Sequence, residues 1–197
     1  MGLKLEDPIA TARGIISDRD ADYRVSDADL LQYANDALDA AIPLRPSLFY
    51  TEGEVACEVG KALQSVSYDD AHALVQVTRI KNGAAVTETD RATLEVFLPG
   101  WMTASAAAAE HWMPVVDDPM RFYVYPPAPA AQVLEVIYIL IPPEFAADED
   151  TGLPKTIEPA IADYIVGMAE SRNDEDVNSG RAAQFLASFS ARLSAKP

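Results

Sequence analysis

Clustered carboxylates are the side chains of this chain with the clearest capacity for chemistry. Two carboxylates that converge on one surface can serve as general acid and general base, or can hold a cation. Acidic residues gather in five places: 18–22, 69–70, 117–118, 148–150 and 174–176. Asp117 and Asp118 are the pair considered for catalysis. Adjacent residues of a strand point to opposite faces, so a small acidic enzyme built on this pair is a remote alternative.

Few groups in the chain could hold a metal ion or a cofactor. Residues 148–152 (Asp-Glu-Asp-Thr-Gly) share acids and a glycine with calcium loops, but they lack the alternating Asp/Asn spacing and the late Glu, which favours a solvated loop. One cysteine and two separated histidines are too few ligands for a Cys/His metal site. The sequence has no glycine-rich phosphate loop and no G-x-S-x-G motif. We expect no catalytic residue, metal or cofactor.

The remaining reactive side chains have ordinary structural interpretations. Cys57 lies in the strand-like run Val55–Val59 with no cation beside it, which favours a half-buried structural thiol. A single cysteine cannot form an internal disulfide, as is typical of a reducing cytosol. His72 follows two aspartates without a nucleophile motif and is interpreted as a loop or strand-edge residue. His111 lies beside Trp112 and is interpreted as a packed or surface histidine.

The charge of the chain excludes several classes of partner. Its 197 residues carry 31 acidic and 15 basic side chains, a formal net charge of −16, and 49% of them are hydrophobic. These values are typical of one globular domain, or of one domain with an extension. No Lys/Arg cluster could form the basic face that nucleic acids or anionic membranes require. The apolar run Val136–Ile141 is far shorter than the roughly 20 residues that span a bilayer, and the N-terminal residues show no signal-peptide pattern.

Periodic apolar residues predict two helices at each end of the chain. The first begins at Asp7-Pro8, and the second begins at Ser26 and ends before Pro43. The third begins near Thr156, and the fourth begins near Asn173 with an acidic first turn and a basic end. The four apolar stripes are Ile9, Ala12, Ile15 and Ile16; Leu30, Ala34, Ala37, Leu38 and Ala41; Ile157, Ile161, Tyr164, Ile165 and Met168; and Ala182, Phe185, Leu186, Phe189 and Leu193.

The middle of the chain has the character of a β region. Val55–Val59 and Ala62–Val66 read as a hairpin that turns at Gly60-Lys61, and Leu74–Ile80 is a strand before an Asn82-Gly83 turn. Residues 90–98 predict a short helix, and residues 101–110 an ordered loop or weak helix. Three further strands complete a mainly antiparallel sheet: His111–Val116, Arg121–Tyr125 and Val133–Ile141.

Two features of this β region bear on contacts. Val133–Ile141 is apolar at nearly every position, so we expect it to be covered on both faces or to meet a neighbouring subunit. The aromatic residues Trp101, Trp112, Tyr123 and Tyr125 suit either core packing or a protein interface, where Trp and Tyr are enriched.

The order of elements predicts an α+β fold. Residues 1–53 and 142–197 form a small helical bundle, and residues 54–141 form an inserted antiparallel β extension.

An ordered series of segments resembles a known family. The series comprises L-L-Q-Y-A-N-D-A-L (Leu30–Leu38), Ala73–Asp90, Pro99-Gly-Trp101, F-Y-V-Y-P-P (Phe122–Pro127), Tyr138–Pro143, Tyr164 and Phe185–Leu193. From about Tyr23 to Leu193, the chain resembles the head-to-tail adaptor (connector) proteins of tailed bacteriophages. The resemblance implies a structural virion protein, assembled in the host cytoplasm, with no catalysis and no membrane.

The resemblance also implies partners. Such adaptors form a homo-oligomeric ring, usually twelvefold, below the portal protein, and they present a platform for the tail tube or nozzle protein. DNA passes through the channel without specific binding. The candidates for ring or tail contacts are Trp101, Trp112, Tyr123, Tyr125, Ile137 and Ile139.

The C-terminal residues are the candidate portal-docking segment. Residues 188–197 read as a flexible, mildly basic tail that orders on the portal, through Phe189, Arg192, Leu193 and Lys196. The alternative is a tail-completion or tail-tube ring protein that does not contact the portal.

Overall fold

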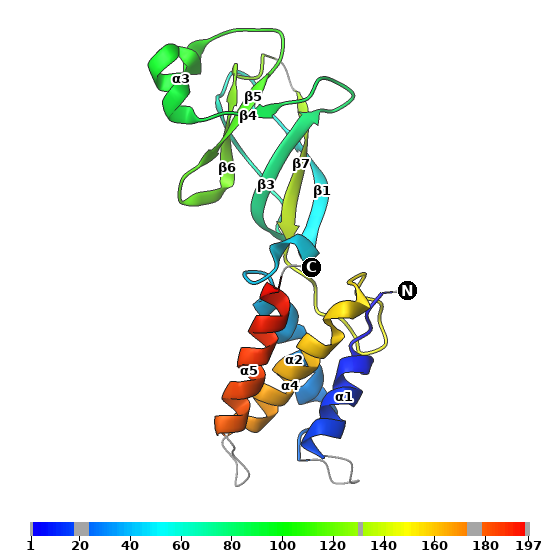
Figure 1. Ribbon diagram of the computed structural model, residues 1–197. Coiled ribbons are helices and arrows are strands. Elements are labelled where there is room, and N and C mark those ends of the chain that lie inside the picture. The colour runs from blue at the N-terminus through cyan, green and yellow to red at the C-terminus, as the bar shows by residue number, and fades with distance from the viewer. Residues whose placement is uncertain (1, 18–23, 130–131, 173–178, 196–197) are drawn as a thin grey trace. The chain divides into compact units, whose positions relative to one another are not determined.

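The computed structural model describes the whole chain except residues 1, 18–23, 130–131, 173–178 and 196–197. The fold is α+β, as the sequence predicts, and it divides into two compact units (Figure 1). The helical unit comprises residues 1–48 and 142–197, and the β unit comprises residues 49–141.

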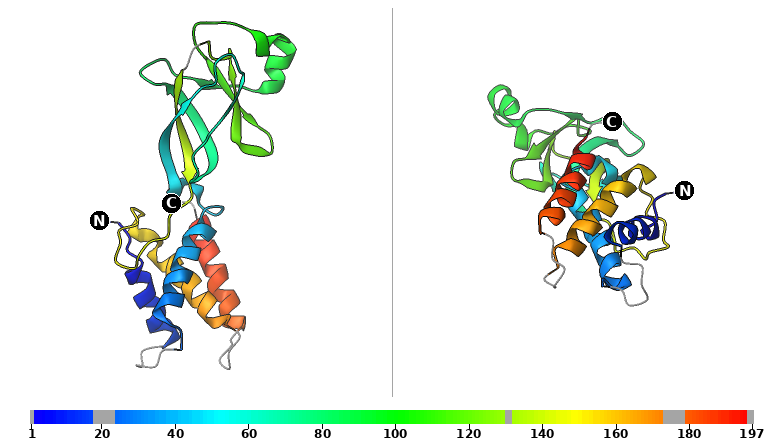
Figure 2. Two further views of the ribbon diagram at one scale, coloured as in Figure 1. Left: turned by 180° about the vertical axis from the view of Figure 1, so that it is seen from behind. Right: turned by 60° about the horizontal axis from the view of Figure 1, so that its bottom comes forward.

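The helical unit is built around one central helix. Its helices are α1 (Glu6–Ile16), α2 (Asp27–Ala41), α4 (Glu158–Glu170) and α5 (Ser179–Ser194). α4 packs against the other three and lies between α1 and α5 (Figures 1 and 2). Its residues are accordingly buried nearly all round, which is typical of a helix enclosed by others. The short 3₁₀ helix η3 (Lys155–Ile157) leads into α4.

Local sequence signals account for both ends of α2, whereas the cap predicted at Asp7 is wrong, because α1 begins at Glu6 and its N-cap Leu5 makes no side-chain cap. The Ser26 side chain accepts a hydrogen bond from the Asp29 amide at 3.1 Å, as the predicted cap requires. All five predicted stripe residues of α2 are buried, and the helix ends before Pro43. α1 ends at Ser17, whose φ of 58° is the left-handed conformation of a helix C-cap. The predicted loop at 18–22 and the predicted start of the last helix at 173 lie outside the described residues.

A side-chain clasp holds the segment after residue 141 to α2. Asn35 Nδ2 donates to the Phe145 carbonyl at 3.1 Å, and the Phe145 amide donates to Asn35 Oδ1 at 2.9 Å. One amide side chain therefore satisfies both main-chain groups of Phe145. Further along this segment the Leu3 amide donates to the Leu153 carbonyl at 2.8 Å, and Leu3 is fully buried.

The β unit contains two sheets. The first is antiparallel, with strand order β1-β7-β3, and the second has the order β2-β6-β5-β4. β4 runs parallel to β5, so the second sheet is mixed and not wholly antiparallel. The strands are β1 (Tyr50–Ala56), β2 (Leu63–Ser65), β3 (Ala71–Ile80), β4 (Thr87–Glu88), β5 (His111–Val115), β6 (Asp118–Tyr125) and β7 (Val133–Leu140). The β unit also contains the short helices α3 (Arg91–Phe97) and η2 (Trp101–Thr103), and the 3₁₀ helix η1 (Pro46–Phe49) spans the chain boundary between the units.

The predicted hairpin between residues 55 and 66 is wrong. β1 pairs with β7 and β2 pairs with β6, so the two strands belong to different sheets. The buried Gln64 side chain shapes the connection, because it accepts from the Glu58 amide and donates to the Glu58 and Lys61 carbonyls. These long-range pairings decide the arrangement, and the local turn signal at Gly60 does not contain them.

Strand β7 alternates between two environments. Leu134, Val136 and Tyr138 face the core that both sheets share, whereas Ile137 and Ile139 are half-buried on the opposite face. The expectation that β7 is covered on both faces is therefore wrong within the subunit. Its other form, contact with a neighbouring subunit, stays a prediction. The predicted strand before Asn82 and the short helix after Asp90 are confirmed.

Candidate functional site

The paired carboxylates do not form a reactive site. Asp117 lies in the turn between β5 and β6 with a φ of 65°, and Asp118 begins β6. Asp118 Oδ2 lies 3.5 Å from Arg121 Nε, and both side chains are substantially exposed. Asp117 is thus a left-handed turn residue, and Asp118 has a surface ion-pair partner.

The histidines and the cysteine are placed as ordinary structural residues. His111 Nδ1 lies 2.7 Å from Thr87 Oγ1, and its ring stacks on Tyr125 with centroids 6.2 Å apart. His72 is exposed on β3. Cys57 is 5% exposed, and burial raises the pKa of its thiol to about 11. A thiol with this pKa stays protonated near neutral pH and is a poor nucleophile.

The acidic loop at 148–152 serves as a clasp for the N-terminal segment. Asp150 Oδ2 accepts from the Gly2 amide at 2.8 Å, and Oδ1 accepts from the Gly152 amide at 2.9 Å. These hydrogen bonds from Gly152 and Gly2 lower the pKa of Asp150. Within the described part of the chain, no group of three or more His, Cys, Asp or Glu side chains could hold a metal ion.

The aromatic candidates for ring or tail contacts lie mainly inside the β unit. Trp101 and Trp112 are 1% and 3% exposed. The Trp101 ring packs edge-on against Tyr123 and Tyr125, with centroid distances of 5.6 and 6.4 Å. The structure thus places both indoles in the core, and the contact role predicted for them has no exposed surface to act through. Tyr123 and Tyr125 are half-buried.

Ile137 and Ile139 lie on the outward face of the first sheet. The register of β1 against β7 pairs Ile139 with Tyr50 and Ile137 with Glu52. Tyr50 is 47% exposed. The same face carries Glu54, whose carboxylate lies 2.7 Å from Lys81 Nζ. This face combines a half-exposed apolar stripe with paired surface charges, so it suits contact with another protein.

The portal-docking candidates divide between core and surface. Phe189 and Leu193 are 3% and 2% exposed, and the Phe189 ring packs edge-on against Tyr164 at 5.0 Å. Arg192 is half-exposed, and its Nε donates to Asp163 Oδ2 at 2.7 Å. Lys196 lies outside the described residues. The expectation of a flexible tail from residue 188 is wrong up to Ser194, because these residues continue α5 and carry part of its buried face.

Two buried carboxylates on α4 were missed by the sequence reasoning. Asp163 and Glu170 are 6% and 4% exposed, and they lie two helical turns apart on the same side. Asp163 accepts from Ser188 Oγ at 2.6 Å and from Arg192, and Glu170 lies 3.2 Å from Arg181 Nη1. The sequence signal for these pairs is the presence of acids within the otherwise apolar run of α4.

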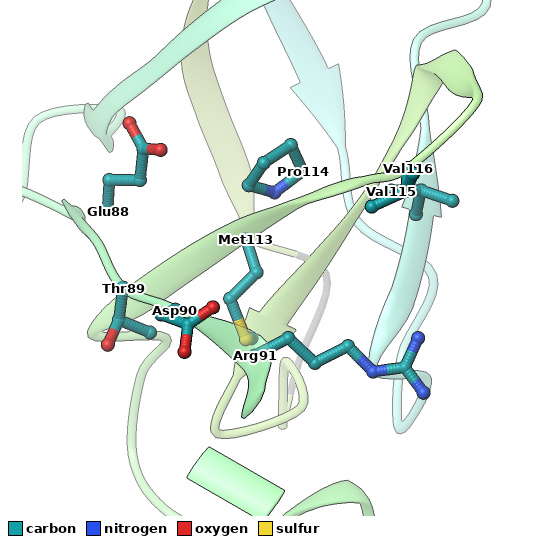
Figure 3. Close-up of a pocket in the computed structure, with 8 residues that line it drawn as sticks. All are labelled: Glu88, Thr89, Asp90, Arg91, Met113, Pro114, Val115 and Val116. Carbon is teal, nitrogen blue, oxygen red and sulfur yellow. The ribbon is translucent and has the colours of Figure 1, made fainter. Parts of the chain in front are cut away.

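Two exposed apolar surfaces of the β unit were also missed. On α3 and the following turn, Val96 and Phe97 are 73% and 76% exposed, with Leu98 and Met102 beside them in sequence. The available signal is two consecutive apolar residues at the end of a seven-residue helix and a third directly after it, which cannot all face one core. A groove of about 520 Å³ lies elsewhere on the same unit, between residues 88–91 and 113–116 (Figure 3).

Fold and surfaces together define a two-unit α+β protein that exposes apolar side chains on its β unit. The chain belongs to the SU10 adaptor protein family, whose model matches residues 5–196. This membership confirms the resemblance to head-to-tail adaptors. It supports a structural role at a head–tail junction. A chain from the neck of an empty GTA particle computed with C6 symmetry is 18% identical, covering 90% of this chain and 88% of that chain, with a TM-score of 0.32. No curated protein sequence matches. Among the described residues, no helix is long and apolar enough to cross a membrane.

Proposed function

We propose that this protein forms a homo-oligomeric ring below the portal protein of a virion, joins the capsid to the tail and extends the DNA channel. The observation that carries the proposal is the adaptor family match over residues 5–196, which includes both units. The helical unit serves as the bundle domain and the β unit as its extension. The ring contains about twelve subunits, a closed arrangement in which each copy presents the same two surfaces to its neighbours.

The charge of the chain supports passage of DNA without specific binding. A net charge of −16 per subunit gives a ring a strongly negative surface, which repels the phosphate backbone. The described cations are largely engaged by carboxylates: Lys81 with Glu54, Arg172 with Asp29, and Lys155 with Asp7, for example. A channel wall of this kind lets DNA slide.

Each unit has one surface that we assign to contacts with partners. On the helical unit, portal docking would use the exposed side of α5 around Arg192 together with Lys196, since Phe189 and Leu193 are already packed against α4. On the β unit, the half-exposed stripe of Tyr50, Ile137 and Ile139 is available to a neighbouring copy or to the tail tube or nozzle protein. No step of this role involves catalysis.

The direct test is negative-stain microscopy of the protein mixed with the portal protein of the same particle. A second ring stacked below the portal is the expected result, and its rotational symmetry gives the subunit number. Lys196→Glu should weaken the stacking if the C-terminal end of the chain docks, whereas Arg121→Glu, at an exposed cation of β6, should not. Bare portals with free subunits would favour the tail-completion or tail-tube ring instead.

A further inference from the structure

Helix α3 of the β unit exposes apolar side chains. Leu94 of α3 packs with Trp101 and Met113, which fixes the side of α3 that faces the core. Val96 and Phe97 are nevertheless 73% and 76% exposed, and Leu98 is 46% exposed. We call Val96, Phe97, Leu98 and Met102 the α3 surface. Exposed apolar residues that adjoin one another in this way mark a contact site more often than isolated ones do.

The α3 surface is also free of charge. Residues 96–109 include no Asp, Glu, Lys or Arg, although the whole chain has a net charge of −16. Copies of an acidic chain repel one another wherever their carboxylates approach. A neutral apolar surface can approach another copy without this repulsion.

The second surface is the β5 groove, formed by residues 88–91 on one side and residues 113–116 on the other (Figure 3). It exists because β4 ends early. The Thr87 and Thr89 amides donate to the carbonyls of Glu110 and Trp112, and the next bond of a parallel ladder would need an N–H at position 114. Pro114 has none, so the chain leaves the sheet after Thr89 and enters α3, while β5 continues with β6 on one edge and no strand among the described residues on the other.

Three charged side chains line the β5 groove: Asp90 and Arg91 have partners within their own subunit, whereas Glu88 is exposed. Asp90 caps α3 by accepting from the Thr93 amide at 2.8 Å and from Thr93 Oγ1 at 2.9 Å. Arg91 lies over the Tyr123 ring at 4.8 Å and pairs with Glu95 at 3.4 Å. The opposite wall, Met113 to Val116, is apolar, and Val116 is 84% exposed. The apolar wall of the groove therefore suits an uncharged apolar side chain.

We propose that the α3 surface of one subunit packs into the β5 groove of the next copy, with Phe97 against Val116. The contact deepens the ring function proposed above and rests on it. A closed ring needs two different, mutually complementary surfaces on each subunit, and the β unit carries both. Every copy therefore carries an uncharged apolar surface that can fill the β5 groove of the next copy.

The same subunit cannot make this contact with itself. α3 begins at Arg91, in the wall of the groove, and a helix of seven residues carries its end about 10 Å away at 1.5 Å per residue. Phe97 and Val116 are 76% and 84% exposed, so they do not pack against each other within one subunit.

The test mixes two single substitutions, Phe97→Cys and Val116→Cys, made in separate batches of the full chain, so that any 97–116 link joins two copies. The mixture is combined with the portal protein and treated with a short bismaleimide. Native Cys57 is 5% exposed and its pKa is raised to about 11, so it does not compete. Val59→Cys mixed with Val116→Cys is the matched control, because Val59 is an exposed valine of the same unit.

We expect rings by microscopy and a cross-linked dimer in the 97/116 mixture at several times the level of the 59/116 control. Rings without more cross-linked dimer than the control would overturn the proposed contact but not the ring function. The α3 surface would then be available to a tail protein. The absence of both rings and dimer contradicts the contact and the proposed function together. A dimer without rings supports the contact and contradicts the ring. Phe97→Asp should also reduce ring formation at least tenfold while leaving the circular dichroism spectrum unchanged.

Discussion

Gly167 of α4 lies directly against Leu186 of α5. A Cβ at position 167 would come within 2.7 Å of Leu186 Cγ and 3.4 Å of the Ala182 carbonyl oxygen. The two helices therefore approach each other at a residue without a side chain. The pairs Asp163–Arg192 and Glu170–Arg181 lie to either side of this approach, so small size and ionic pairing together set the register of α5 on α4.

Substituting Gly167 with Ala should destabilise the helical unit. Overpacking of this kind costs about 1–3 kcal/mol, and the higher helix propensity of Ala returns about 1 kcal/mol, so we expect a net loss of about 1 kcal/mol in the free energy of unfolding. Urea unfolding followed by circular dichroism measures it. Gly100→Ala is the control, since its nearest neighbour would be 4.0 Å away. A stabilised Gly167→Ala variant would contradict the close approach.

Arg192→Met should cost more stability than Asp163→Asn. Without Arg192, a carboxylate that is 6% exposed keeps only Ser188 as its partner, whereas without the charge of Asp163 the half-exposed Arg192 turns to water. We expect losses of about 2–3 and about 1 kcal/mol in the free energy of unfolding. Arg121→Met, at a surface pair, should change it by less than about 0.5 kcal/mol. The reverse order of the first two variants would refute the burial argument.

Asn35→Ala should loosen the segment after residue 141. The substitution leaves the Phe145 amide and carbonyl without their partner, which we expect to lower the free energy of unfolding by about 1–2 kcal/mol. Limited proteolysis should also cut residues 142–153 faster. Gln32→Ala, at an exposed position on the same helix, is the control and should match the parent protein in both measurements. Equal cleavage of the two variants would show that the Asn35 side chain does not hold this segment in place.

The Asp150 clasp predicts an acid-dependent loss of stability. Because hydrogen bonds from Gly152 and Gly2 lower the pKa of Asp150 below its ordinary value of 3.8, its carboxylate stabilises the fold above that pH. This stabilisation is lost as the pH falls through the lowered value. Asp150→Asn should therefore reduce the melting temperature near pH 7, and the difference from the parent protein should shrink from about pH 4 to about pH 2. Asp148→Asn is the control, and a difference independent of pH would count against the clasp.

The sequence predicted the elements that depend on local information. Ser26, the α2 stripe and Pro43 specify a helix within one short segment, and the short helix after Asp90 follows from its apolar residues. The α+β fold class and the resemblance to adaptors could also be predicted from the sequence, because both depend on the order of elements along the chain.

Pairings between strands that lie far apart along the chain could not be predicted from the sequence. The turn signal at Gly60 predicted a hairpin, but the partners of β1 and β2 are β7 and β6, strands that lie about 60 to 90 residues away along the chain. The apolar character of Trp101, Phe189 and Phe97 is similar in sequence, yet the first two are buried and the third is 76% exposed. Burial depends on which other elements lie opposite a side chain.

The sequence by itself therefore determined the helices, most strands, the acidic surface and the family. Only the tertiary structure decided that α5 is held by ion pairs to two buried carboxylates of α4, that the tryptophans belong to the core, and that Phe97 and the β5 groove are exposed. The physical reason is that propensity and periodicity act within a few residues, whereas burial and ion pairing arise between segments that meet only when the chain has folded.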